Sequence, residues 1–120
     1  MLNINTAVKT RIIDQTDEVF EDLDLGNSVF EFEIKSIPTS VKKRIDRECG
    51  TKKGLDVYML MKKQLKECLV GWKGIADNGK EIPFSEQAVD NFYEHNSELA
   101  AAIVVASHKL TIPEAKLAKN

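Results

Sequence analysis

A strict alternation of apolar and charged side chains is the feature that most constrains how this chain folds. Within residues 28–35, Phe30, Phe32 and Ile34 are separated from one another by single charged residues. Successive side chains of an extended strand point to opposite faces, so this period of two places the three apolar side chains on one face. The segment therefore predicts a β-strand with one face in the core and the other in water.

The residues before this strand allow two interpretations. A turn signal at 26–27 makes the strand the second arm of a hairpin, whose first arm is the apolar run at 8–13. Alternatively, Val19, Phe20 and Leu23 lie on one side of a helix. The sequence leaves both interpretations open.

Helical periodicity begins after the strand. Val41, Ile45 and Cys49 repeat every four residues with charged residues between them, which is typical of a helix with one buried face. The threonine and serine at 39–40 are suited to cap its amino end, and Gly50 is suited to end it in a left-handed conformation. These signals predict the first helix.

A second amphipathic helix is predicted from about residue 55 to residue 69. Lysines and a glutamate between its apolar residues are expected to face water. The residues of its predicted buried stripe are Val57 or Tyr58, Met61, Leu65, and Cys68 or Leu69.

The glycine-rich segment after this helix predicts a short ribbon or ordered loop. Gly71 and Gly74 make a continued helix unfavourable, since a glycine in a helix interior costs about 1 kcal/mol. Gly79 supplies the positive φ that a turn requires here. Trp72 and Phe84 are expected to anchor the ribbon through apolar contacts.

Two more helices complete the predicted fold. Ser85 is placed to cap a helix over about 86–93, and the next helix begins at Asn96 and Ser97, the latter as its cap, and continues through Ser107. This last helix is apolar on nearly every side, so it is either central in the fold or presents a second apolar face to a partner. Its apolar residues are Leu99, Ala100, Ile103, Val104, Val105, Ala106 and Leu110.

These elements give an α+β fold that is mostly helical, with about four helices and a small antiparallel hairpin or sheet near the N-terminus. At 120 residues the chain has the usual size of one domain. We expect a single globular domain over residues 28–110, an N-terminal segment 1–27 that is strand or helix, and a flexible polar tail at 111–120.

Charge and hydropathy argue against two classes of partner. The 17 basic and 19 acidic residues give a net charge of −2, whereas a nucleic-acid module needs a concentrated positive surface. The basic residues at 42–47 and 52–53 are predicted to form a solvated helix face. No segment approaches the ~20 apolar residues of a membrane span, so we expect a cytosolic protein.

A search for reactive or metal-binding groups gives no candidate site. Cys49 and Cys68 are not at metal-ligand spacing and are expected to be buried thiols. His95 and His108 stand near helix ends, where a partial positive charge suits the helix dipole. The carboxylates between residues 14 and 24 lack the calcium-loop pattern, which favours a solvated acidic face. We therefore predict no catalytic residue, no metal and no cofactor, as in a protein that is not an enzyme.

The segment 70–85 resembles a pattern of small tail-assembly chaperones and related minor tail proteins of tailed bacteriophages. In that pattern a helix runs into a Trp-Gly loop with a turn, followed by a short helix, an acidic step and an amphipathic helix. Here the loop is built around Trp72 and Gly79, and the acidic step is residues 94–99. The preceding strand and helix also resemble the usual beginning of this family, so the resemblance covers about residues 28–110.

The resemblance implies a non-enzymatic protein made in the infected cell. Such a chaperone binds the tape-measure protein in the host cytoplasm, keeps it soluble and helps to recruit tail-tube subunits during tail morphogenesis. One alternative is a structural component that stays in the virion, such as a tail-completion or connector protein. Another is a regulatory protein that binds nucleic acid through the basic cluster.

A chaperone for a long helical client needs exposed apolar surface and modest affinity, so that tube subunits can displace it. The apolar last helix also makes a homo-oligomer an expected state. The residues predicted to form the partner-binding surface are Met59, Met61, Trp72, Phe84, Leu99, Ile103, Val104 and Leu110.

Overall fold

The computed structural model describes residues 9–110 and confirms the predicted α+β class. Within this range four α-helices accompany a three-stranded antiparallel sheet and two short ribbons of two strands each. Residue 8 of the predicted first hairpin arm and the predicted tail at 111–120 lie outside the described residues. The helices are α1 (Thr39–Glu48), α2 (Val57–Cys68), α3 (Glu86–His95) and α4 (Ser97–Lys109). The strands are β1 (Thr10–Asp14), β2 (Glu31–Lys35), β3 (Gly50–Thr51), β4 (Gly54–Leu55), β5 (Leu69–Lys73), β6 (Ala76–Asp77) and β7 (Lys80–Glu81).

The main sheet has the strand order β1-β2-β5, and both neighbouring pairs are antiparallel. β2 confirms the strand predicted from alternation, because Phe32 and Ile34 are fully buried and Glu33 is exposed. Phe32 stands opposite Ile13 of β1 and Trp72 of β5. The register therefore places the tryptophan of the Trp-Gly loop beside the strand that anchors the core.

The hairpin interpretation of the N-terminal segment is confirmed, since β1 pairs with β2. A long loop joins the two strands, however, and within it Val19 and Phe20 lie in a short 3-10 helix, η1 (Glu18–Phe20). Ile13 and Phe20 belong to the same buried core as β2. The domain therefore begins before residue 28, earlier than the sequence predicted.

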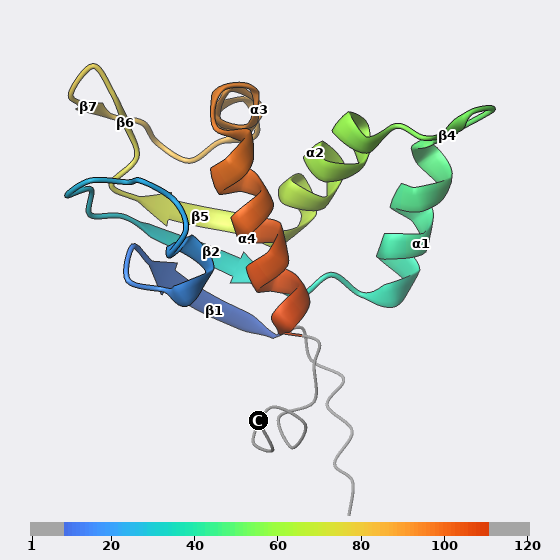
Figure 1. Cartoon of the computed structure of the whole chain (residues 1–120), viewed down its shortest axis with the longest axis horizontal. Coiled ribbons are helices and arrows are strands. Elements are labelled where there is room, and N and C mark those ends of the chain that lie inside the picture. Colours follow the sequence, from blue (N-terminus) through green and yellow to red (C-terminus); the bar gives the residue numbers. More distant parts are fainter. Residues whose placement is uncertain (1–8, 111–120) are drawn as a thin grey trace, which may run out of the picture.

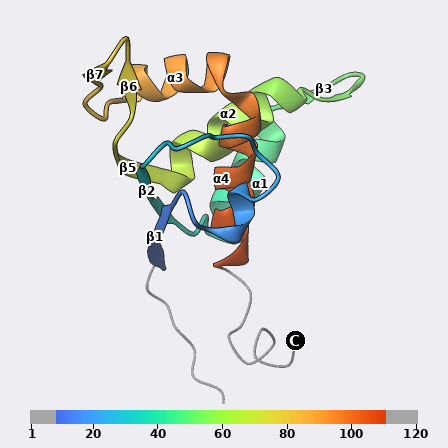
Figure 2. The same ribbon diagram turned by 60° about the vertical axis from the view of Figure 1, so that its left-hand side comes forward.

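α2, α3 and α4 lie on one side of the main sheet, as the two ribbon views show together (Figure 1, Figure 2). α4 is the central element, because it contacts α2, α3, β2 and η1. α1 and the β3–β4 ribbon lie at the edge farthest from the sheet (Figure 1). The molecule thus consists of a sheet layer and a helix layer, with α1 and the β3–β4 ribbon projecting at one end.

Aromatic rings form the centre of the core. The centroid of the Phe32 ring lies 6.2 Å from that of Phe20, 5.3 Å from that of Phe30 and 5.7 Å from that of Phe92. Tilted aromatic pairs at such distances are favourable beyond the burial of their area. Phe32 thereby joins the sheet to η1 and α3.

The central position of α4 decides between its two predicted roles. Ile103 and Val104 are 0% and 2% exposed, so the prediction that they present a partner surface is wrong. Leu99 and Leu110 are half-buried against the same core. A helix packed against several neighbours needs apolar residues on more than one side, which explains its weak amphipathicity. Among the described residues no helix is long and apolar enough to cross a membrane.

The amino ends of the helices follow the predicted caps only in part. Ser85 caps α3 as predicted, with its hydroxyl oxygen accepting from the Ala88 N–H at 3.1 Å. Neither predicted residue caps α1, because Pro38 occupies that position and no side chain bonds to the free amides. Ser97 is the first residue of α4 rather than its cap, a position that Asn96 takes.

The carboxyl end of α1 also differs from the prediction. Gly50 is not left-handed, because the chain passes directly into β3, where Gly50 pairs with Leu55. The Asp56 N–H donates to the Cys49 carbonyl at 2.8 Å and so closes the ribbon. The glycine with positive φ in this ribbon is instead Gly54, with φ of 124°, the first residue of β4.

α2 buries Leu65 and Cys68 as predicted, but its first turn does not reach the core. Val57 is 68% exposed and Tyr58 is 46% exposed, so the predicted start of the buried stripe is wrong. The physical reason is that this turn extends toward the β3–β4 ribbon, beyond the sheet. It meets α3 at Tyr93, whose hydroxyl donates to the Tyr58 carbonyl at 3.0 Å and whose ring centroid lies 5.1 Å from that of Tyr58.

Candidate protein-binding groove

Trp72 connects three elements of the fold. Its indole N–H donates to the Ile82 carbonyl at 2.8 Å, just after β7. Its ring meets Phe84 edge to face, with centroids 5.1 Å apart, and lies 5.7 Å from Phe92 of α3. The predicted role of Trp72 and Phe84 as apolar anchors of the loop is therefore confirmed.

The predicted ribbon is formed by β6 and β7. Asn78 and Gly79 both have positive φ, 51° and 78°, as required by the tight turn between the two strands. The Ile82 N–H donates to the Ile75 carbonyl at 2.7 Å and so extends the pairing by one step toward the sheet. The Gly74 N–H donates to the Glu81 carboxylate at 3.3 Å. These bonds fix the ribbon relative to β5.

Gly74 lets the loop cross the chain that leads into β2. Its φ is 78°, and a Cβ at this position would lie 2.5 Å from the Val29 carbonyl oxygen. Since real Cβ atoms do not approach a backbone oxygen so closely, only glycine allows this crossing. The Trp-Gly spacing of the sequence therefore has a structural cause.

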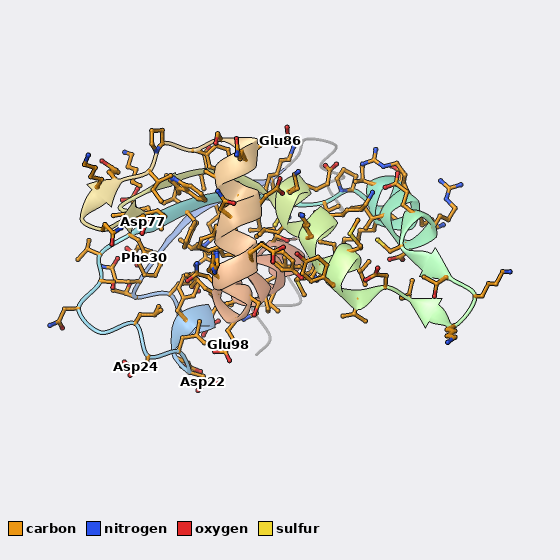
Figure 3. All side chains as sticks on the ribbon, turned by 90° about the horizontal axis from the view of Figure 1, so that it is seen from above. Asp22, Asp24, Phe30, Asp77, Glu86 and Glu98 are labelled. Atoms are coloured by element: carbon orange, nitrogen blue, oxygen red, sulfur yellow. The ribbon has the colours of Figure 1, made fainter. Side chains whose placement is uncertain are left out.

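A groove of about 540 Å³ lies between this loop and α3. Trp72, Ile75 and Ile82 supply its apolar wall, and Asn91 and His95 of α3 supply polar groups. Seen from above, Asp77 marks the ribbon and Glu86 the first turn of α3 (Figure 3). The remaining lining residues are Ala76, Asp77, Ser85, Gln87, Ala88, Phe92 and Asn96.

The lining defines what the groove can bind. Its apolar side chains offer contact area, and its hydroxyl and amide side chains offer neutral hydrogen bonds. Asp77 and His95 are the ionisable side chains that line it. This composition suits a mixed apolar and polar polypeptide surface better than a highly charged ligand.

The eight residues predicted to bind a partner do not form one surface. Trp72 and Phe84 meet beside the groove, whereas Met59 lines a separate, highly charged cleft of about 440 Å³ between α1, α2 and α3. Met61 is half-buried against the core, as are the two leucines of α4. The methionine-bearing helix and the tryptophan loop are therefore two different features.

Ile75, Ile82 and Asn91 line the groove and were not among the predicted residues. A signal for the first two exists in the sequence, because they flank the turn at nearly symmetrical positions and so face each other across a ribbon. Nothing local marks Asn91, whose place depends on how α3 packs beside the loop.

The cysteines are buried as predicted, whereas Asp17 departs from the predicted solvated acidic face, since its side chain is only 9% exposed. Cys49 and Cys68 are buried free thiols, and burial raises the pKa of Cys68 to about 11. The Asp14 carboxylate accepts hydrogen bonds from the Thr16 hydroxyl and N–H, and these bonds lower the pKa of Asp14. Asp17 caps η1, and its carboxylate lies 2.6 Å from the Arg11 guanidinium. Among residues 9–110 no group of three or more metal-ligating side chains gathers.

His108 of α4 is expected to make the fold less stable in acid. Burial lowers its pKa, and the charge of Lys42 lowers it further. Protonation therefore favours the unfolded chain, and the stability from neutral His108 is complete above the ordinary pKa of about 6.5 and lost as the pH falls through the lower folded value. Urea unfolding at pH 7.5 and 5.0 is expected to show a smaller difference for His108→Gln than for the native chain.

The control for this prediction is His95→Gln, which alters an exposed histidine at the end of α3. It shows whether the loss of any imidazole changes the pH dependence as much as the loss of the half-buried one. Equal pH dependence in the native chain and both variants would show that His108 titrates alike in the folded and unfolded states.

Comparison of the chain with protein families, with curated proteins and with solved structures finds no match in any of the three.

Proposed function

We propose that this protein is a non-enzymatic, phage-encoded tail-assembly chaperone. In this function it binds the tape-measure protein in the host cytoplasm and keeps it soluble while tail-tube subunits assemble around it. The observation that carries the proposal is the groove beside Trp72. One of its two walls is formed by the same segment, 70–85, whose sequence resembles that family.

The size and chemistry of the groove support a releasable interaction. A volume of about 540 Å³ accepts a few side chains of a client rather than a whole folded domain. Phe84, 38% exposed, adds an apolar rim beside Trp72. Binding through a small contact of this kind yields modest affinity, which lets tube subunits displace the chaperone.

The test is co-expression with the tape-measure protein and measurement of its soluble fraction. Asn91→Arg places a long charged side chain in the groove from an exposed position on α3 and is expected to abolish the gain in solubility. Glu94→Arg introduces the same side chain one turn along α3, at an exposed residue outside the groove lining, and is expected to retain it.

Three results would contradict the proposal. The first is an unchanged soluble fraction of the tape-measure protein when the native chain is present. The second is equal activity of Asn91→Arg and Glu94→Arg, which would separate the function from the groove. The third is detection of the protein in purified virions, which would favour a structural tail component.

A further inference from the structure

α1 and the β3–β4 ribbon, residues 39–55, form an arm outside the main core. Ile45 and Cys49 of this arm are 1% and 2% exposed, yet neither belongs to the core that unites the sheet, α2, α3 and α4. Val41, near the start of α1, is the arm residue that packs against that core. α2 is the main helical neighbour of α1, and Figure 1 shows the arm at the edge of the molecule.

Two ion pairs join the arm to α2. Arg44 Nη2 lies 2.8 Å from Glu67 Oε1, and Lys63 Nζ lies 2.6 Å from Glu48 Oε2. All four side chains are at least 34% exposed. Water and dissolved salt therefore screen both pairs, and each contributes little to stability.

From these contacts we infer that the arm opens away from α2 as a unit while the main core stays folded. A segment with few buried apolar contacts opens at a lower free energy than the whole protein unfolds. The ion pairs Arg44–Glu67 and Lys63–Glu48 add a small, screened stabilisation to the closed arm, so its opening increases modestly with ionic strength.

Opening uncovers an apolar surface that the closed form hides. It exposes Ile45 on α1 and Cys49 just after it, together with the flank of α2 at Met59, which lines the cleft with Ile45. Arm opening does not involve the groove beside Trp72. If experiments contradict arm opening, the proposed chaperone function still stands, and the converse also holds.

The two cysteines of the chain report on arm opening and core unfolding separately. Cys49 belongs to the arm, whereas Cys68, 0% exposed, belongs to the main core. The native chain is treated with iodoacetamide, and the rate at each cysteine is read by peptide mass spectrometry. Cys49 is expected to react at least about tenfold faster than Cys68, because its exposure needs only local opening.

Salt and a single substitution test the role of the ion pairs. Raising sodium chloride to about 0.5 M, where the Debye length is only a few ångströms, is expected to increase the rate at Cys49 but not at Cys68. Glu67→Gln is expected to raise the Cys49 rate about threefold at low salt and to weaken its salt response. Glu86→Gln is the matched control, since Glu86 pairs with Lys66 between α2 and α3.

Four outcomes would overturn the inference. Equal rates at Cys49 and Cys68 would mean that both are exposed only by global unfolding, as would a lack of reaction at either thiol under native conditions. A fast reaction at Cys49 that neither salt nor Glu67→Gln changes would indicate fraying at the end of α1. Equal acceleration by Glu67→Gln and Glu86→Gln would remove the specific role of the Arg44 pair.

Discussion

Replacing Phe32 with alanine is expected to lower the free energy of unfolding by about 3–5 kcal/mol. Phe32 is fully buried, and its ring contacts rings from η1, from Phe30 just before β2 and from α3. Its removal leaves a cavity at the point where sheet and helices meet, and surrounding groups fixed in β-strands relax poorly. Urea unfolding followed by the fluorescence of Trp72, the single tryptophan, measures the loss.

Ile12→Ala is the control for this prediction. Ile12 lies in β1 next to Ile13, but its side chain points to the opposite face of the sheet and is 61% exposed. Its truncation is expected to cost less than about 0.5 kcal/mol, as at most exposed positions. Similar losses for Phe32→Ala and Ile12→Ala would mean that the sheet does not bury the face that the register indicates.

Features encoded by a few neighbouring residues could be predicted from the sequence. The alternation around Phe32 depends only on the period of a strand, and the cap at Ser85 depends only on the first free amides of α3. The turn at Gly79 follows from the need for positive φ. In each case the local chemistry and the tertiary structure require the same conformation.

Features that depend on distant neighbours were not predictable in this way. β5 carries no alternation of apolar and charged residues, because Gly71 interrupts it. Its pairing with β2 also shifts register between Glu33 and Ile34, which no local pattern predicts. The left-handed cap predicted at Gly50 is replaced by a strand, since Gly50 pairs with Leu55 instead. α4 was ambiguous because an apolar surface on all sides is equally typical of a central helix and of a binding helix.

The candidate groove also has one part that local sequence could predict and one part that depends on distant neighbours. Trp72 and Phe84 were predictable as a pair, because large aromatic residues on either side of a turn tend to meet. The groove itself was not, because its second wall comes from α3. The packing of that helix beside the loop is set by the contacts of Val89 and Phe92 with the core, far from any local signal.

Gly74→Ala is expected to destabilise the protein by about 3 kcal/mol, combining two separate costs. The first is backbone strain, because an alanine at φ of 78° lies in the left-handed region. The second is a collision, because the new Cβ would stand 2.5 Å from the Val29 carbonyl oxygen, and a backbone atom cannot turn away as a flexible side chain does. The chain must therefore shift at the crossing of the loop and β2.

Gly79→Ala separates these two costs. Gly79 has the same φ of 78°, but a Cβ there would meet no atom within 4 Å. Its replacement is expected to cost about 1 kcal/mol, from backbone strain alone. The excess loss in Gly74→Ala, measured by urea unfolding, then belongs to the contact with Val29. Equal losses in the two variants would show that the loop does not cross the backbone closely, and that the Trp-Gly spacing has another cause.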